Sequence, residues 1–443
     1  MVDPCKEPYR NPSVVVVGAG IAGLSAAVKL SQKCKVVVLE AQNQIGGRIS
    51  SFQSGNRTYD LGASWFHDID NNQLYSDIQE SILSSGRKPW PLEIDHTDEN
   101  YEMNVIADDG SVSTVQDVSE KLKCAENILE TIGDDASEFD MSLEEYAHTY
   151  LQPVVGIALR AYESYVGLLW SQMSAVETPP TLLDHGTDAF QFGGNELVID
   201  FLKSKLNSAN TELILNAPVT SISNSEPGIT VSSAAGQFFC KHVIVTAPLA
   251  VLQKAKPSLF ASPIPEPLEN AITNATIAVL AKVVLEFPKR FWRKGLGRVC
   301  CIYKNASVMF SCIYDTQTEN EHSVNKTLLA FVPGPLGASI ERDHASAWPE
   351  LKQFIKPLVD SEVGIVDPQQ VHVSSWSKNE YIRGAYSSLS KGQNMRDLVL
   401  PMMQGAWDDK LLFAGEHCTI QGIGCMDGAY VSGISAAEKV LND

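Results

Sequence analysis

The chain has 443 residues, of which 44% are hydrophobic and 20% charged, and its formal net charge is −19. This composition excludes a disordered chain, and the acidic balance argues against general nucleic-acid binding, which needs a basic face. The length favours two domains over a single core.

The first predicted elements are a strand over residues 14–17 and the helix that follows it. Four consecutive valines are typical of a buried parallel strand, and Gly18, Gly20 and Gly23 follow at the G-x-G-x-x-G spacing. Gly18 permits a tight turn, Gly20 lets a pyrophosphate approach the backbone, and Gly23 lets the helix pack on the strand. The helix, amphipathic over residues 24–30, directs its N-terminal N–H groups at that pyrophosphate. Although a purely structural turn can share this spacing, the pattern predicts a dinucleotide site.

A second strand and a polar loop come next. Residues 36–39 are apolar and end at Glu40, about 20 residues beyond the glycines, where an acid accepts hydrogen bonds from ribose hydroxyls. Ala41 and then Gly46-Gly47-Arg48 follow. A second glycine pair with an arginine favours a flavin dinucleotide over NAD, because Arg48 offers phosphate a fixed, charged donor fork. The alternative for Arg48 is a surface salt bridge.

The motifs G-A-G-I-A-G-L, E-A and G-G-R resemble the N-terminal FAD motif of the flavin amine oxidase superfamily. The resemblance spans nearly the whole chain, because further motifs follow in the order seen in polyamine oxidases: L-G-A-S-W-x-H, V-T-A-P-L, A-K-V-V-L-E-F, W-x(4)-Y-x-R-G-A-Y-S and F-A-G-E-H. The fungal, spermine-oxidising branch is the most similar. The resemblance implies hydride transfer from a secondary amine of spermine, spermidine or an N-acetylated polyamine to flavin N5. An aldehyde, a shorter amine and, with oxygen, hydrogen peroxide would be the products.

The resemblance also implies a discontinuous architecture, and the predicted elements fit it. Strands are predicted over residues 212–215, 219–223, 229–232, 242–246 and 411–416, with helices from Phe192-Gly193 through 206 and from about 428. We expect a mixed α/β protein whose Rossmann-like FAD domain is assembled from residues 1–80, 191–274 and 406–443. A helical, acid-rich insert (81–190) and a mixed segment (275–405) would form a sheet-plus-helix substrate domain.

The family pattern assigns a set of residues to the cofactor. Glu416 resembles the acid that bonds the ribityl chain, Val219 the residue whose backbone reads adenine, and Trp376 a neighbour of the isoalloxazine ring. Each has an ordinary core or strand-end interpretation as well. The full set is Gly18, Ala19, Gly20, Gly23, Glu40, Ala41, Gly47, Arg48, Ser64, Trp65, Val219, Trp376, Glu416, Gly424 and Cys425.

Two residues are predicted to carry the chemistry. Lys282 sits inside an apolar run, where a cation must be neutralised or face a polar cavity. The alternative is an edge-strand lysine with its head in water, but the resemblance places Lys282 where these oxidases hold a lysine that hydrogen-bonds through water to flavin N5. His67 follows Trp65 on the loop facing the flavin in the family, so it is predicted to take up an amine proton or hold the amine. The alternative is a structural histidine that caps a turn.

The substrate end of the site departs from the family. Tyr386 matches one wall of the aromatic cage, whereas Cys425 replaces the tyrosine of the second wall, which favours a long, unbranched polyamine. Ala385 stands where monoamine oxidases have the cysteine bonded to flavin, so FAD is predicted to be non-covalent. Asp188 is predicted to hold a distal ammonium, with a helix-cap or turn role as the alternative. The aromatics Trp170 and Tyr165 line the predicted tunnel or belong to the core.

Two other functions stay open. An oxidase of aryl amines or amino acids is one, although no arginine for a carboxylate clamp can be placed beside Tyr386 from the sequence. An FAD-containing binding protein for an apolar ligand such as a steroid is the other. The nine cysteines include no C-x-x-C pair and the histidines no ligand cluster, so no metal site is predicted. Residues 1–12 lack a signal segment and no apolar run is long enough for a membrane span, so we expect a cytosolic protein.

Overall fold

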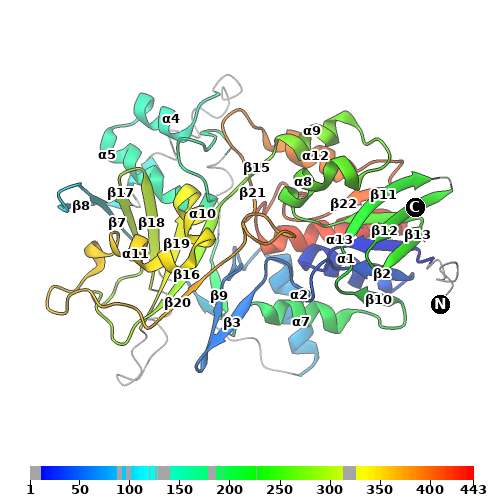
Figure 1. The fold of residues 1–443 in the computed structure, drawn as a ribbon, viewed down its shortest axis with the longest axis horizontal. Coiled ribbons are helices and arrows are strands. Elements are labelled where there is room, and N and C mark those ends of the chain that lie inside the picture. Colours follow the sequence, from blue (N-terminus) through cyan, green and yellow to red (C-terminus); the bar gives the residue numbers. More distant parts are fainter. Residues whose placement is uncertain are drawn as a thin grey trace.

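The computed structural model describes residues 11–86, 92–95, 101–118, 120–124, 127, 140–177, 186–191, 193–225, 227–312 and 326–443. Phe192 and most of the polar N-terminal stretch lie outside these ranges. Two regions lie side by side along the longest axis, each built on its own sheet (Figure 1). Within the described ranges, no helix combines the length and apolar composition needed to span a bilayer.

A five-stranded sheet of parallel strands forms the centre of the first region. Its order is β10 (Thr211–Ile214), β2 (Val36–Leu39), β1 (Val14–Val17), β14 (His242–Val245) and β22 (Leu411–Phe413). Alternate side chains enter different cores: Val14 and Val16 pack toward one face, and Val15 and Val17 toward the other. Because both faces are covered, β1, β2 and β22 are continuously apolar, which is why the sequence predicts them well.

Helices cover one face of this sheet, and a smaller sheet with helices covers the other (Figure 1). The first face carries α1 (Ile21–Ser31), α2 (Gln73–Ser84), α7 (Glu196–Lys205) and α13 (Met426–Asn442). The second carries the antiparallel strands β11 (Val219–Ser225), β12 (Gly228–Ser233) and β13 (Gly236–Cys240), with α8 (Leu249–Leu259), α9 (Glu266–Asn274) and α12 (Met395–Gln404). The sequence prediction omits β13.

A seven-stranded sheet forms the second region. Its order is β20 (Gln370–Val373), β16 (Leu280–Glu286), β19 (Thr327–Pro333), β18 (Ala306–Ser311), β17 (Arg298–Tyr303), β7 (Tyr101–Ile106) and β8 (Val112–Val115). All neighbours are antiparallel except β17 and β7. Around it lie α4 (Leu143–Tyr150), α5 (Pro153–Gly156), the 3₁₀ helix Ile157–Tyr162, α6 (Glu163–Val166), α10 (Gly334–Arg342) and α11 (Ala347–Lys352) (Figure 1).

The sequence predicts a helical insert over residues 81–190. The structure corrects this prediction, because the insert also supplies β7 and β8 to this sheet. Polar residues interrupt β7, so its apolar residues do not identify it as a strand in the sequence. Its pairing with β17 in the structure does. Short strands join the two regions: β5 (Trp65–Phe66) pairs with β9 (Ala189–Gln191), which also pairs with β6 (Leu92–Ile94). The exact domain boundaries stay a prediction.

Candidate cofactor and substrate site

One cavity of about 1230 Å³ extends from the carboxyl ends of β1 and β2 to the seven-stranded sheet. Ligands of open α/β sheets bind at this end of the strands. Most of the predicted residues line it: Gly18, Gly20, Glu40, Ala41, Gly47, Arg48, Ser64, Trp65, His67, Tyr165, Asp188, Val219, Lys282, Trp376, Tyr386, Glu416, Gly424 and Cys425. The fold therefore brings residues from distant segments to one cavity.

In the glycine turn between β1 and α1, Gly18 and Gly23 leave no room for a side chain. A Cβ atom on Gly18, whose φ is +103°, would lie 2.6 Å from Thr246 Oγ1, and one on Gly23 would lie 2.0 Å from the Gly18 carbonyl oxygen. Gly20 is open by contrast, with Gly46 and Gly47 no closer than 3.9 Å to such an atom. The first N–H groups of α1 have no partner inside the helix. This cradle fits the pyrophosphate of a dinucleotide.

Glu40 is fixed at the edge of this cradle by backbone donors. Its Oε2 accepts from the Ala19 N–H at 2.7 Å and its Oε1 from the Gln42 N–H at 2.9 Å. Burial raises the pKa of Glu40, and these hydrogen bonds oppose the shift. A carboxylate held in this way keeps lone pairs for ribose hydroxyls, the role that the sequence predicts.

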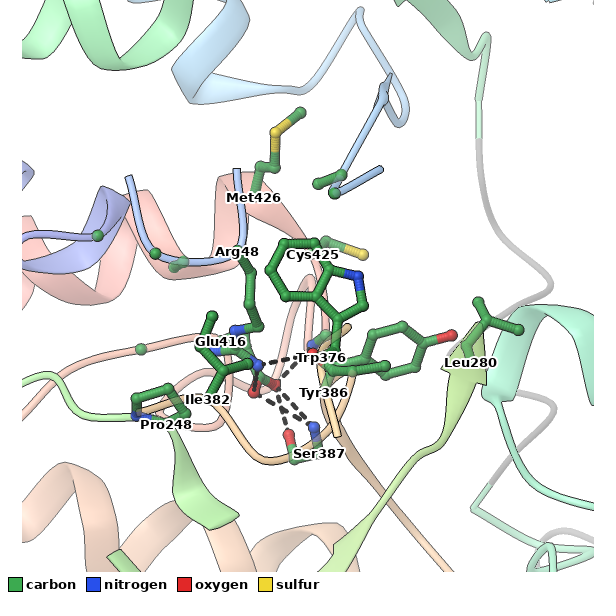
Figure 2. A pocket seen from close by; sticks show the side chains of 18 of the residues that line it. Arg48, Pro248, Leu280, Trp376, Ile382, Tyr386, Ser387, Glu416, Cys425 and Met426 are labelled. Carbon is green, nitrogen blue, oxygen red and sulfur yellow. Dashed lines mark hydrogen bonds and ion pairs between the residues drawn. The ribbon is translucent and has the colours of Figure 1, made fainter. Parts of the chain in front are cut away.

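Arg48 and Glu416 form an ion pair in the middle of the cavity wall. Arg48 Nη1 donates to Glu416 Oε1 at 2.8 Å and to the Ala385 carbonyl at 3.0 Å. Figure 2 shows Arg48 and Ser387 converging on this carboxylate, and the Gly424 N–H also donates to it, at 3.2 Å. Burial alone would raise the pKa of Glu416, but the Arg48 guanidinium and the hydrogen bonds hold that pKa well below its usual range. The alternative of a surface salt bridge is therefore wrong for Arg48.

Lys282 lies on β16, between β20 and β19, so the edge-strand alternative is also wrong. Its Nζ donates to the Gly62 carbonyl and to Ser64 Oγ, both at 2.6 Å, and lies 5.2 Å from the centre of the Trp65 ring. Burial lowers the pKa of Lys282 to about 8, although the Asp60 carboxylate opposes the shift. A lysine in this state exchanges a proton near neutral pH.

Asp60 is a residue that the sequence prediction misses. Burial raises the pKa of Asp60 to about 6, opposed by the hydrogen bond from Ser51 and the charge of Lys282. Its Oδ1 also accepts from the Asn195 N–H at 3.0 Å. Asp60 and Lys282 are thus two buried titratable groups whose pKa values have moved toward each other. Lys282 lines the cavity, and shifted pKa values at such a place are typical of functional sites.

His67 and Asp188 lie against each other on the same cavity. His67 Nδ1 is 2.9 Å from Asp188 Oδ2, while Asp188 Oδ1 accepts from the Asp68 N–H at 3.3 Å. Burial alone would lower the pKa of His67, but the hydrogen bond and the charge of Asp188 raise it above its usual value. Asp188 therefore has a defined partner in the protein, which the sequence prediction does not include. Its contact with a substrate ammonium stays a prediction.

A buried ion pair between Arg298 and Asp95 forms another part of the wall. Arg298 Nη2 lies 2.6 Å from Asp95 Oδ2, which also accepts from Trp65 Nε1 at 2.6 Å, and Arg298 Nη1 donates to the Tyr165 hydroxyl at 2.7 Å. Tyr386 donates its hydroxyl hydrogen to the backbone carbonyl of Tyr165. The sequence analysis finds no arginine to place beside Tyr386, and the structure puts Arg298 on the wall of the same cavity. Because Asp95 neutralises the charge of Arg298, however, the guanidinium of Arg298 is not available to bind a substrate carboxylate.

The remaining aromatic positions are divided between cavity and core. Trp376 lines the cavity and donates Nε1–H to the Leu61 carbonyl at 3.1 Å. Trp170 is not among the cavity-lining residues, so its predicted place in the tunnel is corrected. Its ring instead meets His148 edge-on at 5.6 Å and lies under Arg160 at 5.7 Å. The α4 to α6 region needs Trp170 as its own packing residue, which sequence cannot distinguish from a lining one.

The pattern of flavin-containing amine oxidoreductases matches residues 21–441. The chain belongs to this family. It is 26% identical to the corticosteroid-binding protein of Candida albicans over 98% of this chain and 96% of that protein. It is 28% identical to polyamine oxidase 3 of rice (Oryza sativa subsp. japonica) over 97% and 89%. The solved structure of wild-type putrescine oxidase bound to putrescine has a TM-score of 0.76 and 18% identity, with 98% and 100% covered.

The predicted family, fold class and cofactor are confirmed: this flavin-containing amine oxidoreductase has the mixed α/β fold of its relatives, and its cofactor is FAD. The cavity fits FAD on structural grounds too, because the glycine cradle, Glu40 and the Arg48–Glu416 pair all line it. Several relatives that match along nearly the whole chain are polyamine oxidases by name, including those of maize and Arabidopsis thaliana.

FAD is expected to be released intact when the flavin-containing amine oxidoreductase is precipitated with acid. Ala385 offers no nucleophile, and burial raises the pKa of the Cys425 thiol above its usual range, which keeps it in the unreactive protonated form. The yellow colour should pass entirely into the supernatant, whereas colour left in the washed pellet would show a covalent bond.

Proposed function

We propose that this protein is a polyamine oxidase that oxidises a secondary amine of a linear polyamine and uses oxygen as the acceptor. The observation that carries the proposal is the position of Lys282: a buried lysine with a pKa of about 8 lines the same cavity as the dinucleotide cradle. The preferred substrates are spermine, spermidine or their N-acetylated forms. Whole-chain similarity to polyamine oxidases supports this class.

Bound FAD, which Glu40, Arg48 and Glu416 would hold, would supply the redox chemistry: acceptance of a hydride from the carbon beside the amine nitrogen and transfer of two electrons to oxygen, which gives hydrogen peroxide. The protein's residues bind, orient and exchange protons. His67 takes the proton from the incoming ammonium, because hydride leaves readily only when the nitrogen lone pair is free. Lys282, held by Ser64 and the Gly62 carbonyl, would exchange a proton at its Nζ on the cavity wall. Water then hydrolyses the imine to an aldehyde and a shorter amine.

The shape of the amine end favours an unbranched substrate. Tyr386 provides one aromatic wall of the cavity, and its hydroxyl is held by the Tyr165 carbonyl, so the ring is fixed in place. Cys425 lines the same cavity, and its thiol is much smaller than an aromatic ring. Arg298 and Asp95 line the cavity too. A thin, extended amine fits this cavity better than a compact arylalkylamine.

The protein's charge also supports a polycationic substrate. The net charge of −19 attracts polyamines and raises their rate of encounter at low salt. Inside the cavity His67 is paired with Asp188 and Arg298 with Asp95. We place the protein in the cytosol, where polyamines are abundant.

A panel of amines with peroxide detection tests the proposal. Spermine, spermidine, their N-acetylated forms, putrescine, benzylamine and an L-amino acid are compared at equal concentration, with the purified holoprotein. The proposal expects peroxide with at least one of the first three kinds of substrate and at least about tenfold less with benzylamine and the amino acid. Fastest turnover of benzylamine or the amino acid would contradict it.

A second candidate function is the binding of an apolar ligand such as a steroid. It is favoured by the similarity to the Candida albicans corticosteroid-binding protein and by the apolar residues Leu280, Met309 and Phe331 on the cavity wall. Under this function, the steroid would perturb the flavin spectrum at micromolar concentration while polyamines produce no peroxide. Peroxide from a polyamine would exclude a purely binding role.

A further inference from the structure

The loop that carries His67 is fixed on both sides. The His67 carbonyl accepts from Asn72 Nδ2 at 2.8 Å, and Asn72 caps α2 by accepting from the Tyr75 N–H at 2.9 Å. The next residue but one, Ile69, donates its N–H to the Thr187 carbonyl at 2.9 Å. The backbone of His67 therefore cannot shift without breaking the start of a helix. Only the rotation of its ring remains to be set.

Asp188 sets that rotation, because it binds the ring and the backbone of the same turn. One carboxylate oxygen meets His67 Nδ1 at 2.9 Å and the other accepts from the Asp68 N–H at 3.3 Å. The Asp188 carbonyl in turn accepts from the Asp95 N–H at 2.9 Å. A ring that turned over would lose the carboxylate. The side chain of His67 is nevertheless 36% exposed, toward the cavity.

The charges that face His67 come from several elements. Asp188 is bonded to it, and Asp427 at the start of α13 adds a second negative charge. Arg298 on β17 is the opposing positive charge. Asp68 is the next residue in the chain, and its carboxylate accepts from Asn71. The carboxylates outweigh both Arg298 and the desolvation of the ring, which is why the charged imidazolium is tolerated.

We propose that Asp188 acts through His67: it is a positioning residue that keeps the proton on Nδ1 and thereby leaves Nε2 as the nitrogen that takes the proton from the substrate ammonium. This rests on the proposed function. The transfer is one proton from the ammonium nitrogen to Nε2, which leaves a neutral amine and an imidazolium, while Asp188 stays ionised and keeps its hydrogen bond. Such an arrangement fixes the tautomer and stabilises the charged ring. This role differs from the one that the sequence predicts, in which Asp188 contacts a substrate ammonium directly.

The test uses the holoprotein with isotope-labelled histidine, followed by NMR over a pH series, with the His67→Gln variant to assign the His67 signals. Wild-type His67 should be the Nδ1–H tautomer. In Asp188→Asn its apparent pKa should fall by about 1 unit or more and the tautomer preference should be lost. The matched control is Asp70→Asn, which removes an exposed charge three residues away and should change the pKa much less.

The kinetics of flavin reduction by an amine that the protein oxidises provide the second readout. The pH profile for flavin reduction should shift with the His67 pKa in Asp188→Asn, and the double variant with His67→Gln should be no slower than His67→Gln alone. An Nε2–H tautomer in the wild type, or a His67 pKa unchanged in Asp188→Asn, would overturn the proposal. The proposal would also be overturned if Asp188→Asn only lowered the affinity for diamines and left the pH profile unchanged. If no amine reduces the flavin, the proposed function fails, and the NMR result still decides whether Asp188 sets the tautomer.

Discussion

Replacement of Lys282 by methionine is expected to slow anaerobic reduction of FAD by a polyamine by about 100-fold or more, with FAD still bound. Methionine has a similar volume but cannot exchange a proton or donate to Ser64 and the Gly62 carbonyl. The residues that we propose hold the cofactor, such as Glu40, Arg48 and Glu416, are untouched. Stopped-flow absorbance of the flavin band measures the effect. Reduction at the wild-type rate would remove Lys282 from the chemistry.

Stability provides a check on this variant. The pKa of Lys282 falls from 10.5 to about 8 on folding, so the folded state holds the cation less readily than the unfolded chain does, and this group favours folding more as the pH rises from about 8 to 10.5. Below pH 8 the buried charge is a cost that methionine removes. The Tm of Lys282→Met at pH 7 should therefore equal or exceed that of the wild type. Lys289→Met, on an exposed lysine after β16, is the matched control.

The second large effect is expected from Arg48→Met, which leaves Glu416 as a buried carboxylate without its cation. Removal of one partner of a buried ion pair costs about 3–5 kcal/mol. We expect FAD affinity to fall by about 100-fold or more and the Tm of the holoprotein to drop. Fluorescence titration of the apoprotein with FAD and a thermal melt measure the two effects. Unchanged FAD affinity would contradict the role of the ion pair.

Controls separate the pair from its individual members. Arg342→Met changes an exposed arginine on α10 and should leave both measurements unchanged. The double variant of Arg48→Met with Glu416→Gln should recover part of the lost Tm, because it no longer buries an unpaired charge. The folded-state pKa of Glu416 lies well below the unfolded value of 4.5. Its stabilising contribution is therefore complete at neutral pH and is lost only as the pH falls below 4.5.

The sequence predicts the dinucleotide-binding half accurately because its signals are local. Buried parallel strands such as β1 and β2 are continuous apolar runs, and the glycines between β1 and α1 are required by the close contacts of a single turn. The seven-stranded sheet is harder, since β7 and β8 are short strands that contain polar residues, and β7 pairs with β17, which lies far along the sequence. The insert was therefore expected to be helical.

The polar pairs of the site show the same limit. His67 and Asp188 are 121 residues apart and Arg298 and Asp95 are 203 apart, so no spacing in the sequence relates them. The sequence selects His67 and Asp188 individually, but not their contact. For Arg298 one signal was present: like Lys282, it adjoins an apolar strand, where a cation requires a partner or a polar cavity. Trp170 shows the opposite error, because an aromatic residue near a tunnel packs equally well in the core.

Anaerobic addition of spermine to the yellow holoprotein tests most directly whether FAD and a polyamine share this cavity productively. The account predicts that the yellow absorption band bleaches within the time of mixing and returns when oxygen is admitted, with peroxide formed. A band that keeps its full intensity with spermine, spermidine and their N-acetylated forms would contradict it.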